Sequence, residues 1–289
     1  MMKDTLVKAL AHEGRIRIYV CTSTNLVQEA RDLFDLWPTS CAALGRTLTM
    51  GAMMGSMLKS DHEKLTIQIK GDGPLKNILV DAYYNGRVRG CVGDPEVQLI
   101  YNDSGKLAVG LAVGSEGFLR VIKDVNLKTE FTGTVKLVNG EIGEDFAYYF
   151  TKSEQTPSAV SVGVLVHENE EVVLAAGGLI IQLMPDATEE DIVACEALMK
   201  ELSPISSLVV EGKDSSTIAL SLFPDVEILE ERDIYYHCGC SREHMYEALA
   251  VVQKEELQAM MEEDHGCEIV CNYCNSHYRF SEEEIKNLL

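Results

Sequence analysis

Basic residues are scarce in this sequence. Its 289 residues include 25 Lys and Arg against 46 Asp and Glu, which gives a formal net charge of -21 at pH 7. A charge of this sign and size repels phosphate backbones and anionic lipid, so nucleic acid and membranes are poor candidates for partners. Solubility and contacts with basic, cationic or unfolded partners are compatible with it.

A long uninterrupted apolar run is also missing. Asp4, Lys8 and Glu13 interrupt the start of the sequence, so it has no apolar h-region of a signal peptide and we expect a cytoplasmic protein. The best candidate for a membrane span, residues 41–58, barely reaches spanning length and contains Arg46. We therefore predict that this stretch is a buried helix of a soluble protein.

Motifs of catalysis and of nucleotide binding are absent as well. The run from Gly71 to Pro74 lacks the remaining glycine of a dinucleotide-binding loop. Residues 153–155, Ser-Glu-Gln, suit a turn or a helix cap better than nucleophilic attack. Because no pair of a histidine and an acid stands out at a catalytic spacing, we do not predict an enzyme.

Strand patterns dominate residues 16–184. Alternating runs such as KLTIQIK, and Asn-Gly turns at Asn85 and Asn139 between strand-like runs, predict hairpins and hence antiparallel sheet. Helical patterns interrupt them near residues 25–36, 39–58 and 143–152, without the regular alternation of a doubly wound fold. The sequence predicts an N-terminal α+β domain over residues 1–185.

A helical linker is predicted over residues 186–232. Thr188 and Asp191 form a capping pair, and Ile192, Cys195, Met199 and Leu202 recur at helical spacing. A second short helix begins at Ser203-Pro204, and Gly212 marks a break after it. Such a stretch of short helices packs only as well as its neighbours allow.

The last predicted domain spans residues 233–289. Ser241 caps a helix that reaches residue 250, a second helix follows at 254–263, and Ser281 with Glu284 forms a capping box for the last helix. Strand-like residues 268–270 and 277–280 flank the sequence CNYC. A module of this size has too few apolar residues to be secure by burial alone, so it needs an additional crosslink.

The nine cysteines are unevenly distributed. Cys21, Cys41, Cys91 and Cys195 are isolated among apolar neighbours, and we interpret each as a small buried hydrophobic residue. The remaining five crowd into the last quarter of the chain, at Cys238, Cys240, Cys267, Cys271 and Cys274. A disulfide framework is disfavoured in a reducing compartment.

The spacing HCGC and CNYC predicts a zinc site. In a Cys-x-x-Cys turn both sulfurs face one point, and four thiolates at about 2.3 Å close a tetrahedron around a zinc ion. We predict Cys238, Cys240, Cys271 and Cys274 as the ligands. A closed four-sulfur site leaves no open position for a substrate, so it is structural rather than hydrolytic.

Other ligand sets and other functions remain as alternatives. His237, His265 and His277 could each replace a sulfur, and Cys267 could bind through its looser spacing to Cys271. Otherwise Cys267 is a spare surface or half-buried thiol, available for disulfide exchange once the metal is lost. The alternative function is that of an enzyme or a nucleic-acid-binding protein with a purely structural zinc module.

Four zinc-bound thiolates can also react with oxidants. Joining Cys271 to Cys274 removes two ligands at once, and the metal-binding free energy that folds the module, on the order of 10 kcal/mol for structural zinc, is lost with them. The four cysteines are therefore predicted to be redox-active, with unfolding as the response.

The sequence resembles the heat shock protein 33 family of redox-regulated chaperones over nearly its whole length. The most specific feature is the Cys-x-Cys pair followed by the Cys-x-x-Cys pair at this separation. Further matching segments are LVKALAHEGRIRIY, WPTSCAALGRTLT, IKGDGPLKNILVDA, FTGTVKLVNGEIGEDFAYYFTKSEQTPS and AAGGLIIQLMP.

This resemblance implies an N-terminal α+β domain, a helical linker and a C-terminal zinc domain that keeps the reduced protein inactive. It implies that oxidation pairs the two cysteines within each motif, releases zinc and unfolds the linker, so that a holdase, often a dimer, binds unfolding proteins. Carried over to this sequence, Cys238, Cys240, Cys271 and Cys274 are ligands and redox sensors. Cys267 lies outside the family pattern.

Overall fold

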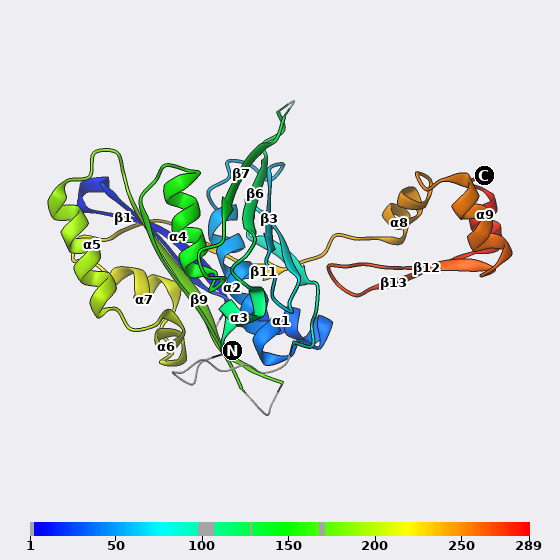
Figure 1. Ribbon diagram of the computed structural model, residues 1–289. Coiled ribbons are helices and arrows are strands. Elements are labelled where there is room, and N and C mark those ends of the chain that lie inside the picture. Colours follow the sequence, from blue (N-terminus) through cyan, green and yellow to red (C-terminus); the bar gives the residue numbers. More distant parts are fainter. Residues whose placement is uncertain (1–2, 98–106, 128, 168–170) are drawn as a thin grey trace. The chain divides into compact units, whose positions relative to one another are not determined.

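The chain forms two compact units in the computed structural model, Met1–His237 and Cys238–Leu289 (Figure 1). The structure describes residues 3–97, 107–127, 129–167 and 171–289. Helices and antiparallel strands are mixed along the first unit, which confirms the predicted α+β class. None of the described helices has both the length and the apolarity that crossing a membrane requires.

One sheet of the first unit is buried on both faces. Its strand order is β10-β1-β2-β9-β8, and all neighbouring strands are antiparallel. Side chains alternate between two cores, so that Leu6 and Tyr19 face one core while Val7 and Ile18 face the other. The strand bounds are β1 (Thr5–Ala11), β2 (Ile16–Thr22), β8 (Ser158–Val166), β9 (Val173–Leu183) and β10 (Glu227–Asp233).

The other large sheet has the strand order β11-β5-β4-β3-β6-β7. Asn85 and Gly86 connect β4 to β5 as a hairpin, as predicted, and Gly86 has the positive φ of +85° that this turn requires. The bounds are β3 (Lys64–Lys70), β4 (Asn77–Tyr83), β5 (Arg87–Val92), β6 (Phe118–Asp124), β7 (Phe131–Lys136) and β11 (Tyr235–Tyr236).

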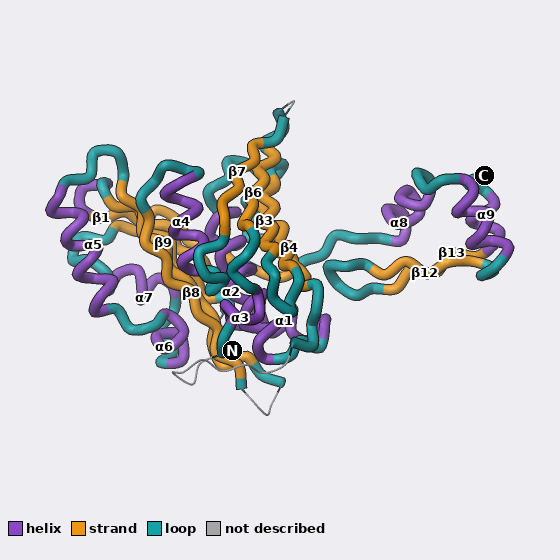
Figure 2. The backbone as a smooth tube through the Cα atoms, viewed as in Figure 1, coloured by secondary structure: helices purple, strands orange, loops and turns teal. Residues whose placement is uncertain are grey.

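Helix α2 (Pro38–Gly55) is the buried helix predicted over residues 39–58, and it packs against strands of both large sheets (Figure 2). Its glycines allow this close packing: a Cβ at Gly51 would lie 2.8 Å from Val80 of β4. Arg46, the charge that argues against a membrane span, pairs with Glu141 at 2.9 Å. Apolar burial along such a helix contributes about 1.5–3 kcal/mol for each large side chain.

The prediction of a hairpin at Asn139-Gly140 is wrong. This turn joins β7 to helix α4 (Gly143–Lys152) instead of joining two strands. The buried carboxylate of Asp145 accepts hydrogen bonds from the backbone N–H groups of Val138 and Ile142, at 2.7 and 3.0 Å. These hydrogen bonds hold residues 138–142 in a turn that leads directly into α4. The Asn-Gly sequence here therefore precedes a helix. Helices α1 (Thr24–Phe34) and α3 (Val109–Val113) also contact α2, whereas the short 3-10 turn η1 (His12–Gly14) connects β1 to β2.

Three helices cover the face of the first sheet that looks away from α2, and Figure 2 shows the sheet between them and α2. They are α5 (Glu189–Glu201), α6 (Ile205–Val210) and α7 (Ser215–Leu220). The capping pair of Thr188 and Asp191 at the start of α5 is confirmed, because each side chain accepts the other residue's backbone N–H. The helical prediction is wrong for residues 227–232, which pair with β1 as strand β10.

The second unit is a small α+β module. Its elements are α8 (Arg242–Leu249), α9 (Lys254–Glu262), β12 (Gly266–Val270), β13 (His277–Ser281) and α10 (Glu282–Lys286). The predicted caps at Ser241 and at Ser281 with Glu284 are confirmed. Its buried apolar core consists of Leu249, Leu257, Phe280 and Ile285 among the residues that the structure describes. A core this small supports the expectation that the module needs an additional crosslink.

Candidate metal centre

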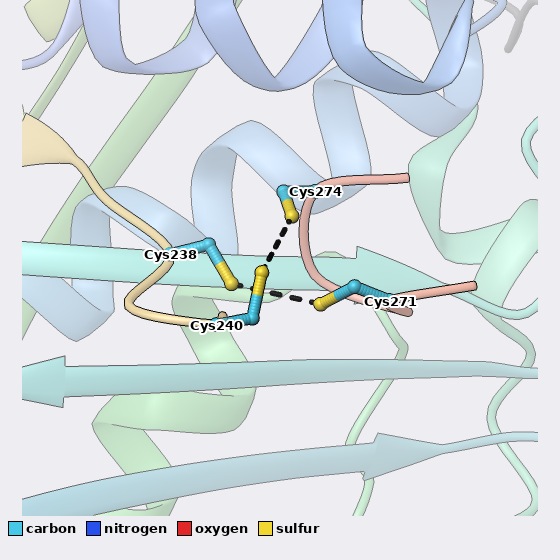
Figure 3. Close-up of side chains that lie close together, drawn as sticks. All are labelled: Cys238, Cys240, Cys271 and Cys274. Atoms are coloured by element: carbon cyan, nitrogen blue, oxygen red, sulfur yellow. Dashed lines mark hydrogen bonds between the residues drawn. The ribbon is translucent and has the colours of Figure 1, made fainter. Parts of the chain in front are cut away.

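Two backbone turns bring the paired cysteines together (Figure 3). Cys238 and Cys240 lie on the segment before α8, and Cys271 and Cys274 lie on the turn between β12 and β13. The four Sγ atoms lie within 4.8 Å of one another. Across the two segments, Cys238 Sγ is 3.6 Å from Cys271 Sγ, and Cys240 Sγ is 3.2 Å from Cys274 Sγ.

The turn around Cys271 is stabilised by its own backbone. The N–H of Cys271 donates to the Ser276 carbonyl at 2.9 Å, and the N–H of Asn275 donates to the Cys271 carbonyl at 2.8 Å. Asn275 has a φ of +55°, a left-handed conformation that asparagine tolerates better than most residues. The strand pairing of β12 with β13 therefore fixes both sulfurs of this motif at the end of one hairpin.

The sulfurs differ in their electrostatic surroundings. Burial raises the pKa of the Cys274 thiol, but hydrogen bonds from the Ser276 hydroxyl and backbone, with smaller effects from Cys240 and Cys271, bring it down to about 7. Burial raises the pKa of Cys271 to about 12 and also raises that of Cys240. Four thiolates at these separations repel one another, so the cluster can be fully deprotonated only around a cation. The arrangement can hold a metal ion.

Tyr278 is a neighbour of this cluster that sequence reasoning missed. Its hydroxyl lies 3.1 Å from Cys240 Sγ, and this hydrogen bond raises the pKa of Tyr278 to about 12. The phenol therefore stays protonated at neutral pH and donates to the sulfur. The signal was its position four residues after Cys274, on a strand that leads back from the CNYC turn.

Among the described residues, none of the alternative ligands belongs to the group of atoms that could share one ion. His265 pairs with Glu282 at 3.7 Å, and His277 pairs with Glu268 at 3.2 Å. Cys267 packs against the apolar core of the module, opposite Phe280 in the β12–β13 pairing. His237 belongs to the first unit, where its N–H donates to the Val88 carbonyl at 3.0 Å. Within the described residues, the group close enough to share one ion consists of Cys238, Cys240, Cys271 and Cys274.

The isolated cysteines behave as small apolar residues. Cys21, Cys41 and Cys195 are buried as predicted, whereas Cys91 is half-buried. Burial raises the pKa of Cys41 to about 12 and that of Cys91 to about 11. These thiols stay protonated at neutral pH, so they are poor nucleophiles and poor metal ligands.

Comparison with known proteins gives matches over nearly the whole chain. The model of the family described as "Hsp33 protein" matches residues 4–281. The 33 kDa chaperonins of Bacillus cereus (strain AH187) and Bacillus anthracis (strain A0248) are each 47% identical over 290 residues, which cover 100% of this chain and 99% of each relative. The crystal structure of the 33 kDa chaperonin (heat shock protein 33 homolog) from Thermotoga maritima matches with a TM-score of 0.91 and 36% identity, covering 99% of this chain and 98% of that one.

Proposed function

Since this chain belongs to the Hsp33 family, we propose that its four clustered cysteines bind one zinc ion and serve as its redox sensor. The protein is a molecular chaperone, and redox regulation fits both the family and the cysteine cluster. The observation that carries the proposal is the convergence of Cys238, Cys240, Cys271 and Cys274 within 4.8 Å. We infer that it acts as a cytoplasmic holdase and not as an enzyme.

The sulfur geometry supports zinc. Four sulfurs at about 2.3 Å from one ion in a tetrahedron lie about 3.8 Å apart. The separations of Cys238 from Cys271 and of Cys240 from Cys274, 3.6 and 3.2 Å, are close to this value, and all four sulfurs lie within 4.8 Å of one another. A set of four thiolates also favours zinc over the hard cations, which prefer oxygen ligands. When bound, zinc supplies a crosslink between the two cysteine segments.

The same cysteines supply the oxidation step. Cys271 and Cys274 thiolates give two electrons to one hydrogen peroxide molecule, which takes up two protons and becomes two water molecules, and the pair becomes a disulfide. Cys238 and Cys240 repeat this with a second peroxide. Because a disulfide sulfur is no longer a thiolate ligand, the crosslink between the segments is lost and the module unfolds.

Residues 186–232, of which 227–232 belong to strand β10, are proposed as the linker between an N-terminal domain, residues 1–185, and a zinc domain, residues 233–289. Helices α5 to α7 cover the first sheet with apolar side chains such as Leu198, Met199 and Leu202. If oxidation releases these helices, the apolar surface beneath them becomes accessible to unfolding proteins, which are the proposed clients. A dimer of the oxidised form would enlarge that surface.

The test of this function combines zinc content with suppression of aggregation. The reduced protein should contain one zinc per chain and should suppress the aggregation of an unfolding test protein only weakly. Peroxide with mild heating should release the zinc and produce strong suppression, whereas heating under reducing conditions should do neither. A reduced protein without metal would refute the site, and suppression that is independent of oxidant would refute the switch.

The two motifs should oxidise in a fixed order. A disulfide between Cys271 and Cys274 encloses two intervening residues, whereas one between Cys238 and Cys240 encloses only Gly239 and requires strained geometry. We expect the CNYC pair to close first, with zinc release, and the HCGC thiols to close later or to pair with Cys267 or with another chain.

Mass mapping of disulfides over a peroxide time course, with zinc release followed in parallel, measures this order. Chaperone activity should follow the later steps, because the linker is released only when the module has unfolded. Early formation of the Cys238–Cys240 disulfide, with Cys271 and Cys274 still reduced, would contradict the predicted order of oxidation.

A further inference from the structure

A cavity of about 470 Å³ opens in the first unit at the β1 and β2 strands. Three cationic side chains line it, Lys8 from β1, Arg17 from β2 and Lys123 from β6. The remaining wall includes the Tyr19 ring and Gln182 on the polar side, and apolar side chains such as Phe150. The formal net charge of the protein is -21, so its overall composition does not account for three cationic side chains around one cavity.

The carboxylates, one of which, Glu154, lines the cavity itself, do not neutralise these three cations one for one. Lys123 pairs with Glu154 at 2.6 Å, and Lys8 pairs with Glu230 at 3.4 Å. Glu230 is shared, because it also pairs with Arg232. Among the described residues, Arg17 forms no ion pair with a carboxylate. The cavity therefore has an excess of positive charge centred on Arg17.

Crowding of these cations has an electrostatic cost. Burial, followed by the positive charges of Arg232 and Arg17, lowers the pKa of the Lys8 ammonium. Burial raises the pKa of the Tyr19 hydroxyl, and the Arg17 cation beside it partly opposes this shift. A purely structural arrangement would relieve such repulsion with one more carboxylate. A bound anion relieves this repulsion equally well. Its electrostatic attraction to the cations is strongest where their side chains are partly shielded from water.

We propose that this cavity binds a small multivalent oxyanion that carries phosphate or carboxylate groups. Arg17 would be its main contact, because a guanidinium matches two oxygens of such a group at once, with Lys8 and Lys123 as further cationic contacts. The volume is within the usual range for small-molecule sites and exceeds what a single phosphate ion needs. A small organic phosphate or a polycarboxylate fits it better than inorganic phosphate.

Binding can be measured by calorimetry on the reduced, zinc-loaded full chain. The probes are inorganic phosphate, pyrophosphate, citrate and glucose 6-phosphate, each compared with chloride at the same ionic strength. We expect saturable binding of one anion per chain, with pyrophosphate, citrate or glucose 6-phosphate tighter than inorganic phosphate. A preference for citrate would indicate a carboxylate ligand, and a preference for the other two a phosphate ligand. The absence of saturable binding for all four probes at millimolar concentration would overturn the proposal.

Two arginines form a matched pair of variants. Arg17→Gln should weaken binding about tenfold or more, because it removes charged hydrogen bonds to the anion. Arg120→Gln is the control, since Arg120 lies on β6, stacks over Phe118 at 4.8 Å and does not line the cavity. Arg17→Lys should restore part of the affinity, which separates loss of charge from loss of fold. Equal effects of Arg17→Gln and Arg120→Gln, or none for Arg17→Gln, would overturn the assignment.

Discussion

Replacing Cys271 with serine is expected to abolish stable zinc binding and to unfold residues 238–289 while the first unit stays folded. Cys271 is the buried member of the sulfur cluster, and a serine hydroxyl remains protonated at neutral pH and is a poor zinc ligand. The loss would be large, because structural zinc contributes on the order of 10 kcal/mol to folding. The small core around Leu249, Leu257 and Phe280 cannot replace that contribution.

Two cysteine variants serve as controls for this prediction. Cys267→Ser changes a half-buried thiol of the same module that lies outside the sulfur cluster, and Cys91→Ser changes one in the first unit. Both should retain one zinc per chain. Zinc stoichiometry and hydrogen exchange measure the outcome: Cys271→Ser should lose protection after residue 237 and keep it before. Unchanged zinc content in Cys271→Ser would refute the ligand assignment.

The sequence could predict the local chemistry well, because that chemistry depends on short-range patterns. The capping pair of Thr188 with Asp191 and that of Ser281 with Glu284 follow from spacing alone. The meeting of HCGC and CNYC could be inferred because a small module has few other ways to be crosslinked. The buried helix α2 was predictable because Arg46 is the single charged residue among its mostly apolar and small residues.

Features that depend on distant partners could not be predicted in this way. Strand β10 forms because it can pair with the edge of β1. The residues of β10 are alternately exposed and half-buried, so that in sequence the segment resembles a polar linker. The turn at Asn139 becomes a helix entry because the buried Asp145 carboxylate collects its backbone N–H groups. The cation-lined cavity brings together Lys8, Arg17 and Lys123, which are separated by up to 115 residues in the sequence (123 minus 8).

Asp191 anchors the start of residues 186–226, the main part of the proposed linker, to the turn between β1 and β2. Its side chain, only 2% exposed, accepts a hydrogen bond from Arg15 Nε at 2.9 Å and lies 2.6 Å from His12 Nδ1. It also accepts the Thr188 N–H at 2.7 Å. The turn between β1 and β2, which contains His12 and Arg15, also contacts the end of residues 186–226. There the His12 ring packs edge-on against Phe223 at 5.0 Å. The β1–β2 turn thus secures both ends of residues 186–226.

This contact persists across the neutral pH range. The backbone N–H of Thr188, followed by Arg15 and His12, holds the pKa of the Asp191 carboxyl well below its usual value. A carboxyl whose pKa is depressed in the folded state stabilises that state at every pH above the usual carboxyl pKa. The stabilisation is lost only as the pH falls below that value. Mild acid alone should therefore leave α5 docked.

Asp191→Ala is expected to release α5 and to give a chaperone that is active while reduced and still zinc-bound. It removes a carboxylate that both caps the helix and neutralises Arg15, so the melting temperature of the first unit should fall by on the order of 5 °C.

Glu190→Ala is the matched control, because Glu190 lies in the same helical turn and is exposed. Hydrogen exchange of residues 186–226, zinc content and suppression of aggregation under reducing conditions provide the three measurements. Release of α5 without any gain in suppression would show that undocking of the linker does not activate the chaperone, and unchanged protection of α5 would show that Asp191 does not fasten it.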